Sequence, residues 1–160
     1  SGWAACGGPG KVGAMARRPR DTALAYMAAW NALDADACAA CFAPDGVREG
    51  RIMAQATRPG HRFPRFVGRD AIRERIAGFM EAVPDLSVEI LRVGEGPEDT
   101  AWLEWRLTGT HTRDWGAWPA RGERVDVPAV SIYRVRDGLI QEETEYIDPQ
   151  VLMTPPPEEG

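Results

Sequence analysis

The chain has 160 residues, a net charge of −5 and 27% charged residues. Its basic residues are scattered among acidic ones, whereas nucleic-acid binding needs a basic stripe, so the sequence argues against a nucleic-acid partner. No apolar run approaches the length of a membrane span, which argues against a membrane protein. The length predicts one globular domain with a substantial core.

Composition places the expected domain boundaries near the two ends of the chain. Residues 1–20 are rich in Gly and Arg and show no periodicity, so we expect a flexible tail there, a folded domain over 21–153 and a second tail over 154–160. The first tail lacks the apolar segment of a secretory signal, and three cysteines do not make a disulfide framework, so we expect a cytoplasmic protein. Cys38 and Cys41 are expected to be small buried hydrophobic residues.

Apolar residues at helical spacing predict three helices, over residues 21–33, 35–42 and 69–83. Asp21 and Asp34 are the expected N-caps of the first two. Turn residues and alternating polarity divide the remainder of the chain. We expect a turn at 43–46, a short strand over 47–53, an irregular loop over 54–67, strands over 86–93 and 100–112, a loop over 114–122, and two closing strands within 125–148.

Helices followed by a meander of long strands indicate an α+β fold rather than alternating β and α units. We expect a curved antiparallel sheet wrapped around three N-terminal helices, so that the domain forms a cone with an internal cavity. Such a cavity is the default site for a small molecule.

The closing strands join at residues 136–138, and the length of this connection sets their register. A two-residue turn at 137–138 places Ser131 opposite Thr144. A three-residue loop places Ser131 opposite Glu143. We favour the three-residue loop, because an arginine suits a type I turn and does not suit the left-handed positions of a type I′ turn.

In the favoured register one face of the hairpin carries four polar groups: Ser131, Tyr133, Glu143 and Glu145. A carboxylate inside an apolar hairpin costs several kcal/mol unless it is paired or protonated. The hairpin is therefore the first place to look for chemistry.

Several segments resemble SnoaL-like proteins, which are polyketide-cyclase relatives in the nuclear-transport-factor-2-like superfamily that also contains ketosteroid isomerases. The resemblance covers residues 21–153. It rests on YMAAWNALD at 26–34, FAPDGV at 42–47, FVGRDAIR at 66–73, FMEAVPDL at 79–86, EWRLTGTHT at 104–112, VRDGLI at 135–140 and YIDP at 146–149.

The resemblance implies roles for particular positions. Polyketide cyclases of this type use an aspartate base where this chain has Glu145, and a histidine where it has Ser131. Ketosteroid isomerases use a tyrosine on the first helix, at the position of Tyr26, an acid near Glu49, and a protonated aspartate at or beside Ser131. In this fold the convex sheet face commonly pairs with a second copy, so a homodimer is expected.

The chemistry implied is proton transfer next to a carbonyl group, because a carboxylate in an apolar pocket can take a proton from carbon while a hydroxyl steadies the enolate. We expect Glu145 as the catalytic base, with Tyr26 or Ser131 as the donor. The substrate would be a small hydrophobic, ring-bearing carbonyl compound, and the enzyme an isomerase or aldol-type cyclase without cofactor or metal. A lyase, or a hydrolase in which Glu145 orients a water, is the less favoured enzyme. The alternative is a non-catalytic protein that binds a small lipophilic ligand or acts as a dimerising accessory.

Seven further residues are expected to contact the substrate: Glu49, Trp102, Trp105, His111, Trp118, Tyr133 and Glu143. Structural alternatives remain open for several candidates. Glu145 could face solvent at a strand end or pair with Arg134, and Tyr26 could be an ordinary core residue. Glu49 could be a solvated charge, and His111 a hydrogen-bonded structural residue. The enzyme hypothesis requires Glu145 inside the cavity, whereas the binding hypothesis predicts an apolar pocket whose acids point outward.

Overall fold

The computed structural model describes residues 15–52, 63–116 and 118–147. It contains three helices, α1 (Pro19–Asn31), α2 (Ala35–Ala40) and α3 (Arg69–Ala82). All three were expected, within a few residues of these bounds. The predicted C-terminal tail lies outside the described residues, as does most of the N-terminal one.

The helices begin in two different ways. Helix α1 starts at Pro19, two residues earlier than expected, because proline suits the first turn, where its missing N–H is not needed. Asp21 therefore lies inside the first turn, where its charge favours the helix dipole, and it does not act as a cap. Asp34 caps α2 as predicted, since its side chain accepts a hydrogen bond of 2.9 Å from the Ala37 N–H.

The strands form one six-stranded sheet in the order β2-β1-β6-β5-β4-β3. Their bounds are β1 Phe42–Ile52, β2 Arg65–Val67, β3 Ser87–Gly96, β4 Thr100–Thr110, β5 Arg124–Arg136 and β6 Leu139–Ile147. The expectation of a wholly antiparallel sheet is wrong, because β1 pairs with β6 in parallel while the other neighbours are antiparallel. The short first strand is longer than predicted, and the expected turn at 43–46 is an irregularity within it.

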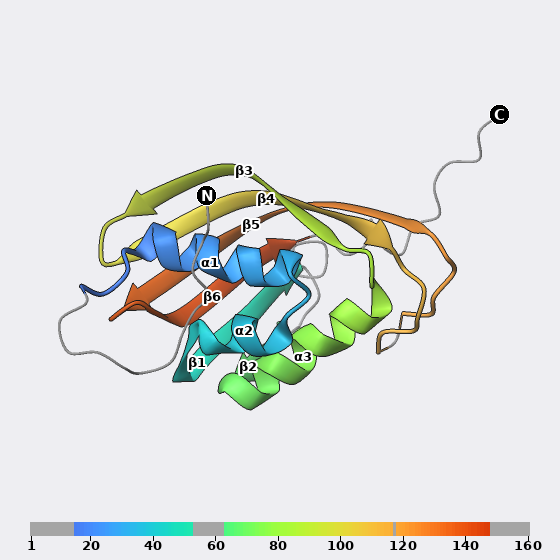
Figure 1. Cartoon of the computed structure of the whole chain (residues 1–160), viewed down its shortest axis with the longest axis horizontal. Coiled ribbons are helices and arrows are strands. Elements are labelled where there is room, and N and C mark those ends of the chain that lie inside the picture. The colour runs from blue at the N-terminus through green and yellow to red at the C-terminus, as the bar shows by residue number, and fades with distance from the viewer. Residues whose placement is uncertain (1–14, 53–62, 117, 148–160) are drawn as a thin grey trace.

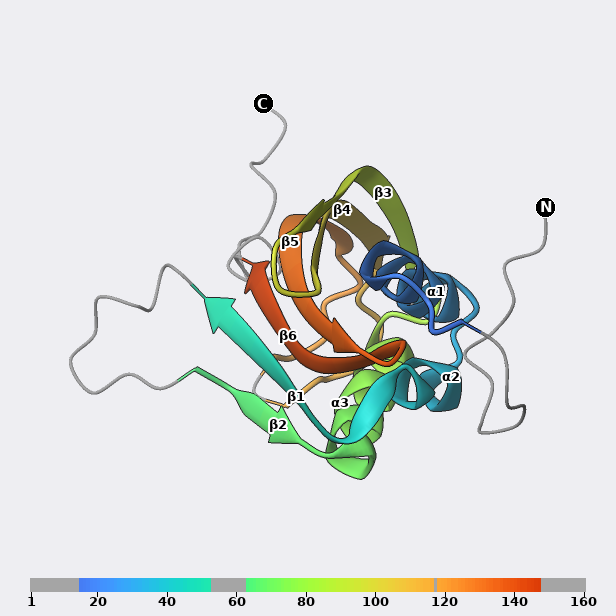
Figure 2. The same ribbon diagram turned by 90° about the vertical axis from the view of Figure 1, so that its left-hand side faces the viewer.

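The sheet is curved, and all three helices lie on its concave side (Figures 1 and 2). The core fills the space between these two layers. Alternate residues of β4 and β5 are buried, as the period-two pattern requires, and Leu103 and Tyr133 are fully buried examples. Tyr26 on α1 and Ile76 on α3 are buried from the helical side. The α+β fold inferred from the sequence is confirmed.

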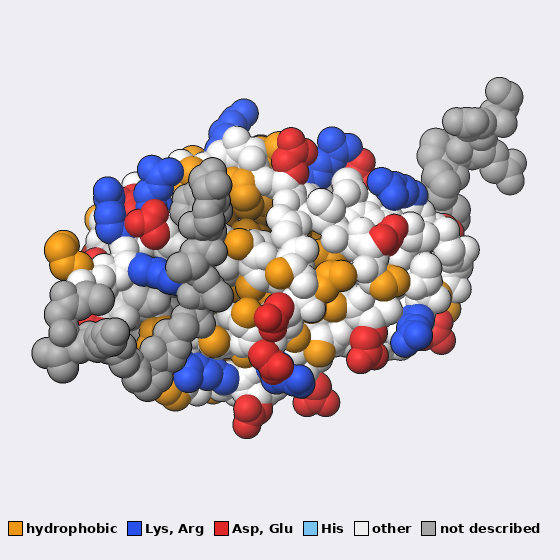
Figure 3. All heavy atoms as spheres, in the orientation of Figure 1, with side chains coloured by type: hydrophobic (Ala, Val, Ile, Leu, Met, Phe, Trp, Pro, Cys, Tyr) orange, Lys and Arg blue, Asp and Glu red, His pale blue; other side chains and the backbone are white. Residues whose placement is uncertain are grey.

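The outer surface mixes charges of both signs. On the face seen in Figure 3, acidic, basic and hydrophobic side chains are interspersed. None of the described helices is long and apolar enough to cross a membrane.

The hairpin between β5 and β6 turns through two residues, so the favoured three-residue loop is wrong. Asp137 and Gly138 have φ values of 52° and 73°, and Arg136 pairs with Leu139. Both central residues are left-handed, as in a type I′ turn. Aspartate adopts this conformation more readily than most residues because its short polar side chain can bond locally. The left-handed position thus falls on Asp137, and not on the arginine.

With a two-residue turn and regular pairing, Glu143 and Glu145 would face the opposite side of the sheet from Ser131 and Tyr133. One extra residue in β6 brings all four side chains back to the same face. Val135 pairs with Ile140, but Arg134 pairs with Glu142, so Gln141 is left out of the pairing as a bulge. Beyond this point Ser131 pairs with Glu145, and Tyr133 pairs with Glu143. The predicted common face of these four residues is confirmed, although through a different register.

Cys38 lies in α2 and Cys41 is the residue that ends it. Both are buried, as expected for small hydrophobic residues. Cys38 is a free thiol. Cys41 is disulfide-bonded, which the sequence analysis did not foresee.

We expect Asp137→Val to lower the free energy of unfolding by about 1–2 kcal/mol, because a β-branched residue is poorly tolerated in the left-handed region. Asp137→Asn is the matched control and should leave stability nearly unchanged, since asparagine adopts this conformation equally well. Urea denaturation of the three proteins measures the difference. Equal midpoints for the valine and asparagine variants would contradict the assigned turn.

Candidate functional site

A cavity of about 80 Å³ lies between the concave face of the sheet and helices α1 and α3. This volume has room for about half a dozen water molecules, at roughly 10–15 Å³ each on this measure. Six aromatic side chains contribute to its lining: Trp30, Phe66, Phe79, Trp105, Trp115 and Trp118. The charged side chains in the lining are Arg48, Arg75, Glu143 and Glu145.

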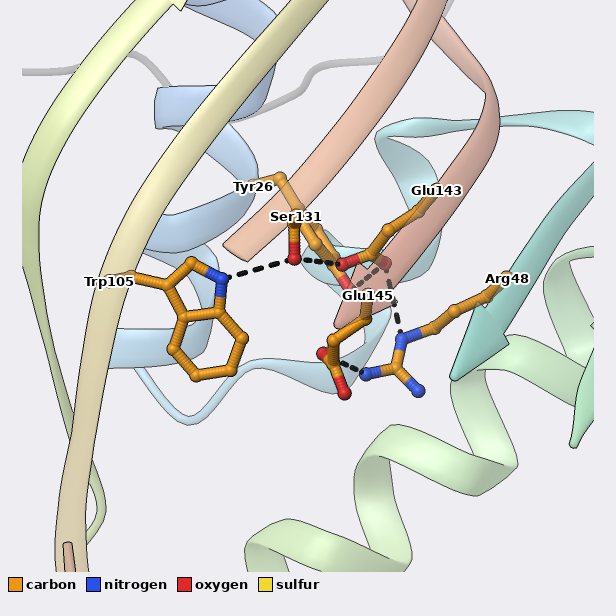
Figure 4. A network of polar contacts seen from close by, with 6 residues as sticks. All are labelled: Tyr26, Arg48, Trp105, Ser131, Glu143 and Glu145. Carbon is orange, nitrogen blue, oxygen red and sulfur yellow. Dashed lines mark hydrogen bonds and ion pairs between the residues drawn. The ribbon is translucent and has the colours of Figure 1, made fainter. Parts of the chain in front are cut away.

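Glu143 is the centre of a buried polar network (Figure 4). Its carboxylate is 1% exposed and accepts three hydrogen bonds. Tyr26 Oη and Arg48 Nε donate to Oε2 at 2.9 and 3.1 Å, and Ser131 Oγ donates to Oε1 at 3.2 Å. Trp105 Nε1 in turn donates to Ser131 Oγ at 3.0 Å. The hydroxyl hydrogens of Tyr26 and Ser131 are thus directed at Glu143.

Glu145 lies two residues after Glu143 on β6, and its side chain faces the cavity. Its Oε2 accepts a 2.8 Å hydrogen bond from Arg48 Nη2, so one guanidinium bridges both carboxylates. The alternative pairing with Arg134 is wrong, because that arginine pairs with the exposed Glu142. Glu145 therefore lies inside the cavity, as the enzyme hypothesis requires.

The pairing of the strands explains how this cluster assembles. Arg48 pairs with Glu143 across the parallel β1–β6 contact. Ser131 pairs with Glu145 across β5–β6 because of the bulge at Gln141. Tyr26 reaches the same point from α1, which packs on the concave face.

Burial raises the pKa of Glu143 from 4.5 to about 7, and the neighbouring negative charge of Glu145 acts in the same direction. Arg48 and the hydrogen bonds from Tyr26 and Ser131 oppose this shift without cancelling it. Glu143 therefore exchanges its proton near neutral pH. A titratable group with a perturbed pKa in a cavity wall is a candidate for acid–base chemistry.

The two buried tyrosines remain neutral in the folded protein. Burial and the charge of Glu143 raise the pKa of both Tyr26 and Tyr133 well above 10. The rings of the two tyrosines meet edge to face, with centroids 5.9 Å apart. Tyr133 Oη makes no hydrogen bond to any described residue, so this tyrosine lies beside the network without joining it.

Four of the predicted substrate contacts, Glu49, Trp102, His111 and Tyr133, do not contribute to the cavity lining, and Tyr133 is fully buried beside the network. Trp102 is 38% exposed, Glu49 pairs with Arg51 at 2.8 Å, and His111 is buried at the end of β4. His111 Nε2 has no hydrogen-bond partner in the described part of the chain. Trp105 and Trp118, by contrast, line the cavity as expected.

Two arginines of the cavity escaped the sequence analysis. Arg48 stands in the charged stretch Val-Arg-Glu-Gly-Arg (47–51), which looks solvent-exposed until β1 is known to lie beside β6. The available signal was indirect: two carboxylates predicted on a buried face require a buried counter-charge. Arg75 flanks the apolar face of α3 and would be taken for a surface residue by periodicity alone. Within the described residues, no cluster of three His, Cys, Asp or Glu side chains could hold a metal ion.

The sequence matches the model of one known protein family. Residues 23–143 match the family model described as SnoaL-like domain. No protein of curated function matches the sequence significantly.

Solved structures share the fold at low sequence identity. A protein from Jannaschia sp. CCS1 assigned as a SnoaL-like polyketide cyclase is 20% identical, with a TM-score of 0.72 over 93% of this chain and 100% of that chain. AclR from Streptomyces galilaeus, assigned as a hydroxylase, is 20% identical, with a TM-score of 0.66 over 86% and 97%. A Catenulispora acidiphila protein with a ketosteroid isomerase-like fold, solved with trimethylamine, is 19% identical, with a TM-score of 0.63 over 79% and 85%. At such identities the likeness establishes the fold alone.

The raised pKa of Glu143 predicts a stability that falls with rising pH. The folded protein holds this proton more tightly than the unfolded chain, so the stabilisation is fully present below about pH 4.5 and is lost as the pH rises through about 7. A shift of this size corresponds to about 3 kcal/mol, at about 1.4 kcal/mol per pKa unit. We expect Glu143→Gln to remove most of this dependence.

Urea unfolding at pH 5 and pH 8 measures the effect. The matched control is Glu142→Gln, on the same strand but exposed, which should keep the wild-type pH dependence. The other titratable groups are common to all three proteins, so their contributions cancel in the comparison. An unaltered pH dependence in Glu143→Gln would show that another group is responsible.

Proposed function

The chain belongs to the SnoaL-like family, and on that premise we propose that it is a cofactor-free enzyme of proton transfer next to a carbonyl group. It would act as an isomerase or aldol-type cyclase on a hydrophobic, ring-bearing substrate. The observation that carries the proposal is that Glu143 and Glu145, two carboxylates in unlike environments, face one aromatic cavity. Pairs of titratable groups in unlike environments are typical of acid–base sites.

Glu145 is the proposed base. Its Oε1 makes no hydrogen bond to any described residue, while Oε2 is held by Arg48 (Figure 4). One oxygen is thus fixed and the other is free to approach a C–H bond. A base must lie within hydrogen-bond reach of the proton that it removes, which requires a position in the cavity wall.

Arg48 is the proposed donor to the developing enolate. Its Nε and Nη2 are occupied by Glu143 and Glu145, and Nη1 makes no hydrogen bond within the described residues. A cationic donor that is already fixed in place stabilises an oxyanion strongly, because it needs no reorganisation during the reaction.

Tyr26 and Ser131, expected as donors to the substrate, are better explained as positioning residues. Both hydroxyls donate to Glu143, and neither residue contributes to the cavity lining. They fix the orientation of Glu143, which in turn fixes Arg48. Replacing Tyr26 by Phe should therefore reduce turnover less than replacing Glu145 does.

The proposed reaction balances without a co-reactant. Glu145 takes the proton from the carbon next to the carbonyl; the C–H electron pair forms a C=C bond, and the π pair of the carbonyl moves onto its oxygen. The resulting enolate faces the Arg48 N–H. Where a C=C bond adjoins that carbon, the enolate extends to a dienolate, and Glu145 returns the proton at its far carbon, which isomerises the substrate. Otherwise the enolate carbon attacks a second carbonyl of the same molecule, which closes a ring, and Glu145 gives its proton to the alkoxide oxygen that forms.

The alternative function is binding of a small lipophilic ligand without turnover. One observation favours it: both oxygens of Glu143 are hydrogen-bonded, as in a purely structural network. Both functions place a ligand in the same cavity, so turnover distinguishes them.

We expect the protein to catalyse hydrogen–deuterium exchange at the carbon next to the carbonyl of 2-tetralone, an enolisable ring ketone. Glu145→Gln should reduce the exchange rate by about 100-fold or more, because general-base catalysis contributes factors of about 10²–10⁴. Proton NMR in D₂O follows the exchange, and calorimetry checks that the variant still binds the ketone.

Glu142→Gln serves as the matched control, since it removes a half-exposed carboxylate that lies outside the cavity on the same strand. Unchanged exchange in Glu145→Gln would remove this residue from the mechanism. If the wild type binds ring ketones but exchanges none, the binding function becomes the better explanation.

A further inference from the structure

Arg75 lines the cavity from α3 and forms no ion pair with any described residue. Its guanidinium carbon lies 3.7 Å from the ring centroid of Trp115 and 5.2 Å from that of Phe66. Its Nε is buried and has no hydrogen-bond acceptor in the described part of the chain. The proposed proton transfer gives this arginine no role.

The surroundings of Arg75 leave its charge uncompensated. Burial, together with the nearby Arg48, lowers the pKa of Arg75 to about 10, so the side chain stays protonated at neutral pH. Glu145 acts in the opposite direction, but its hydrogen bond goes to Arg48. Contact with two aromatic rings stabilises the positive charge but provides no acceptor for hydrogen bonds from its N–H groups. A half-buried guanidinium with unused donors is suited to receive an anion.

We propose that Arg75 binds a carboxylate carried by the substrate or ligand of this cavity. The occupant would be a ring-bearing compound whose apolar part contacts the aromatic walls and whose carboxylate meets the guanidinium. Arginine offers two parallel N–H donors in one plane, which match the two oxygens of a carboxylate. The inference rests on the proposed function only for the statement that the same compound also carries the reacting carbonyl group.

The charges of the lining favour a singly charged anion. When Glu143 is protonated, the charged groups of the lining are two guanidinium ions and the Glu145 carboxylate, which leaves one excess positive charge. When Glu143 is ionised, the lining is neutral. A phosphate dianion would leave a negative charge uncompensated in either state, whereas one carboxylate balances the first state.

The test compares two ligands of nearly the same shape, 2-naphthoate and 2-naphthamide, by isothermal titration calorimetry. Wild type should bind the carboxylate about 10-fold or more tightly than the amide, since hydrogen bonds to charged groups are worth about 1.5–3 kcal/mol. Arg75→Met should lose this preference while keeping its affinity for the amide. Arg75→Lys should retain part of it, because the charge remains and the planar fork is lost.

Arg73→Met is the matched control, because Arg73 lies on the same helix but is half exposed and pairs with Asp36. It removes the same charge from the protein and should leave the preference intact. Circular dichroism checks that each variant folds, and the lysine variant carries the test if the methionine variant does not. A wild type without preference for the carboxylate, or a preference that survives in Arg75→Met, overturns the inference.

Failure of this inference is distinguishable from failure of the proposed function. Calorimetry reports binding and needs no turnover. An Arg75-dependent preference without deuterium exchange in any ketone would leave the carboxylate site standing and remove the proton transfer. Exchange of neutral ketones without a carboxylate preference would do the reverse.

Discussion

The contact of Arg48 with Glu143 and Glu145 is the constraint on which the rest of the site depends. Three ionisable groups are withdrawn from water here, and each would cost several kcal/mol if left unpaired. One guanidinium cannot fully compensate two carboxylates. The remainder is met by the proton of Glu143, whose pKa burial raises to about 7. Tyr26 and Ser131 donate to the same carboxylate and hold it in place.

Two irregular features of the sheet, the parallel pairing of β1 with β6 and the bulge at Gln141, bring the charged groups of this cluster together. Arg48 reaches Glu143 because β1 pairs in parallel with β6, the last described strand. In a simple antiparallel meander, β1 would not lie beside β6. The bulge at Gln141 corrects the face of β6 after the two-residue turn, so that both glutamates point to the concave side. A regular hairpin with the same turn would have aimed them at the convex face. Local irregularity in the strand thus positions the charged groups.

The sequence predicted what depends on local patterns. Helices α1–α3, strands β3–β6 and the common face of Ser131 and Glu145 follow from periodicity, because side-chain direction alternates along a strand whatever its partner. The position of Arg48 does not, since it depends on a parallel pairing between segments about a hundred residues apart. The turn prediction failed for a different reason. It was decided on the conformational preference of Arg136, but in the two-residue turn the left-handed positions are those of Asp137 and Gly138, and Arg136 is the last residue of β5.

The proton of Glu143 and the charge of any ligand are physically coupled. A carboxylate held at Arg75 would add a negative charge to a wall that already contains Glu145, and a like charge favours the protonated form of a neighbouring carboxyl group. The same event would leave Arg48 with one ionised partner in place of two, and so with more of its charge available to an enolate. Glu145 faces the cavity and accepts a hydrogen bond from Arg48. A carboxylated substrate would thus favour the protonated form of Glu143 as it binds, whereas with a neutral ligand the protonation of Glu143 would depend on the pH alone.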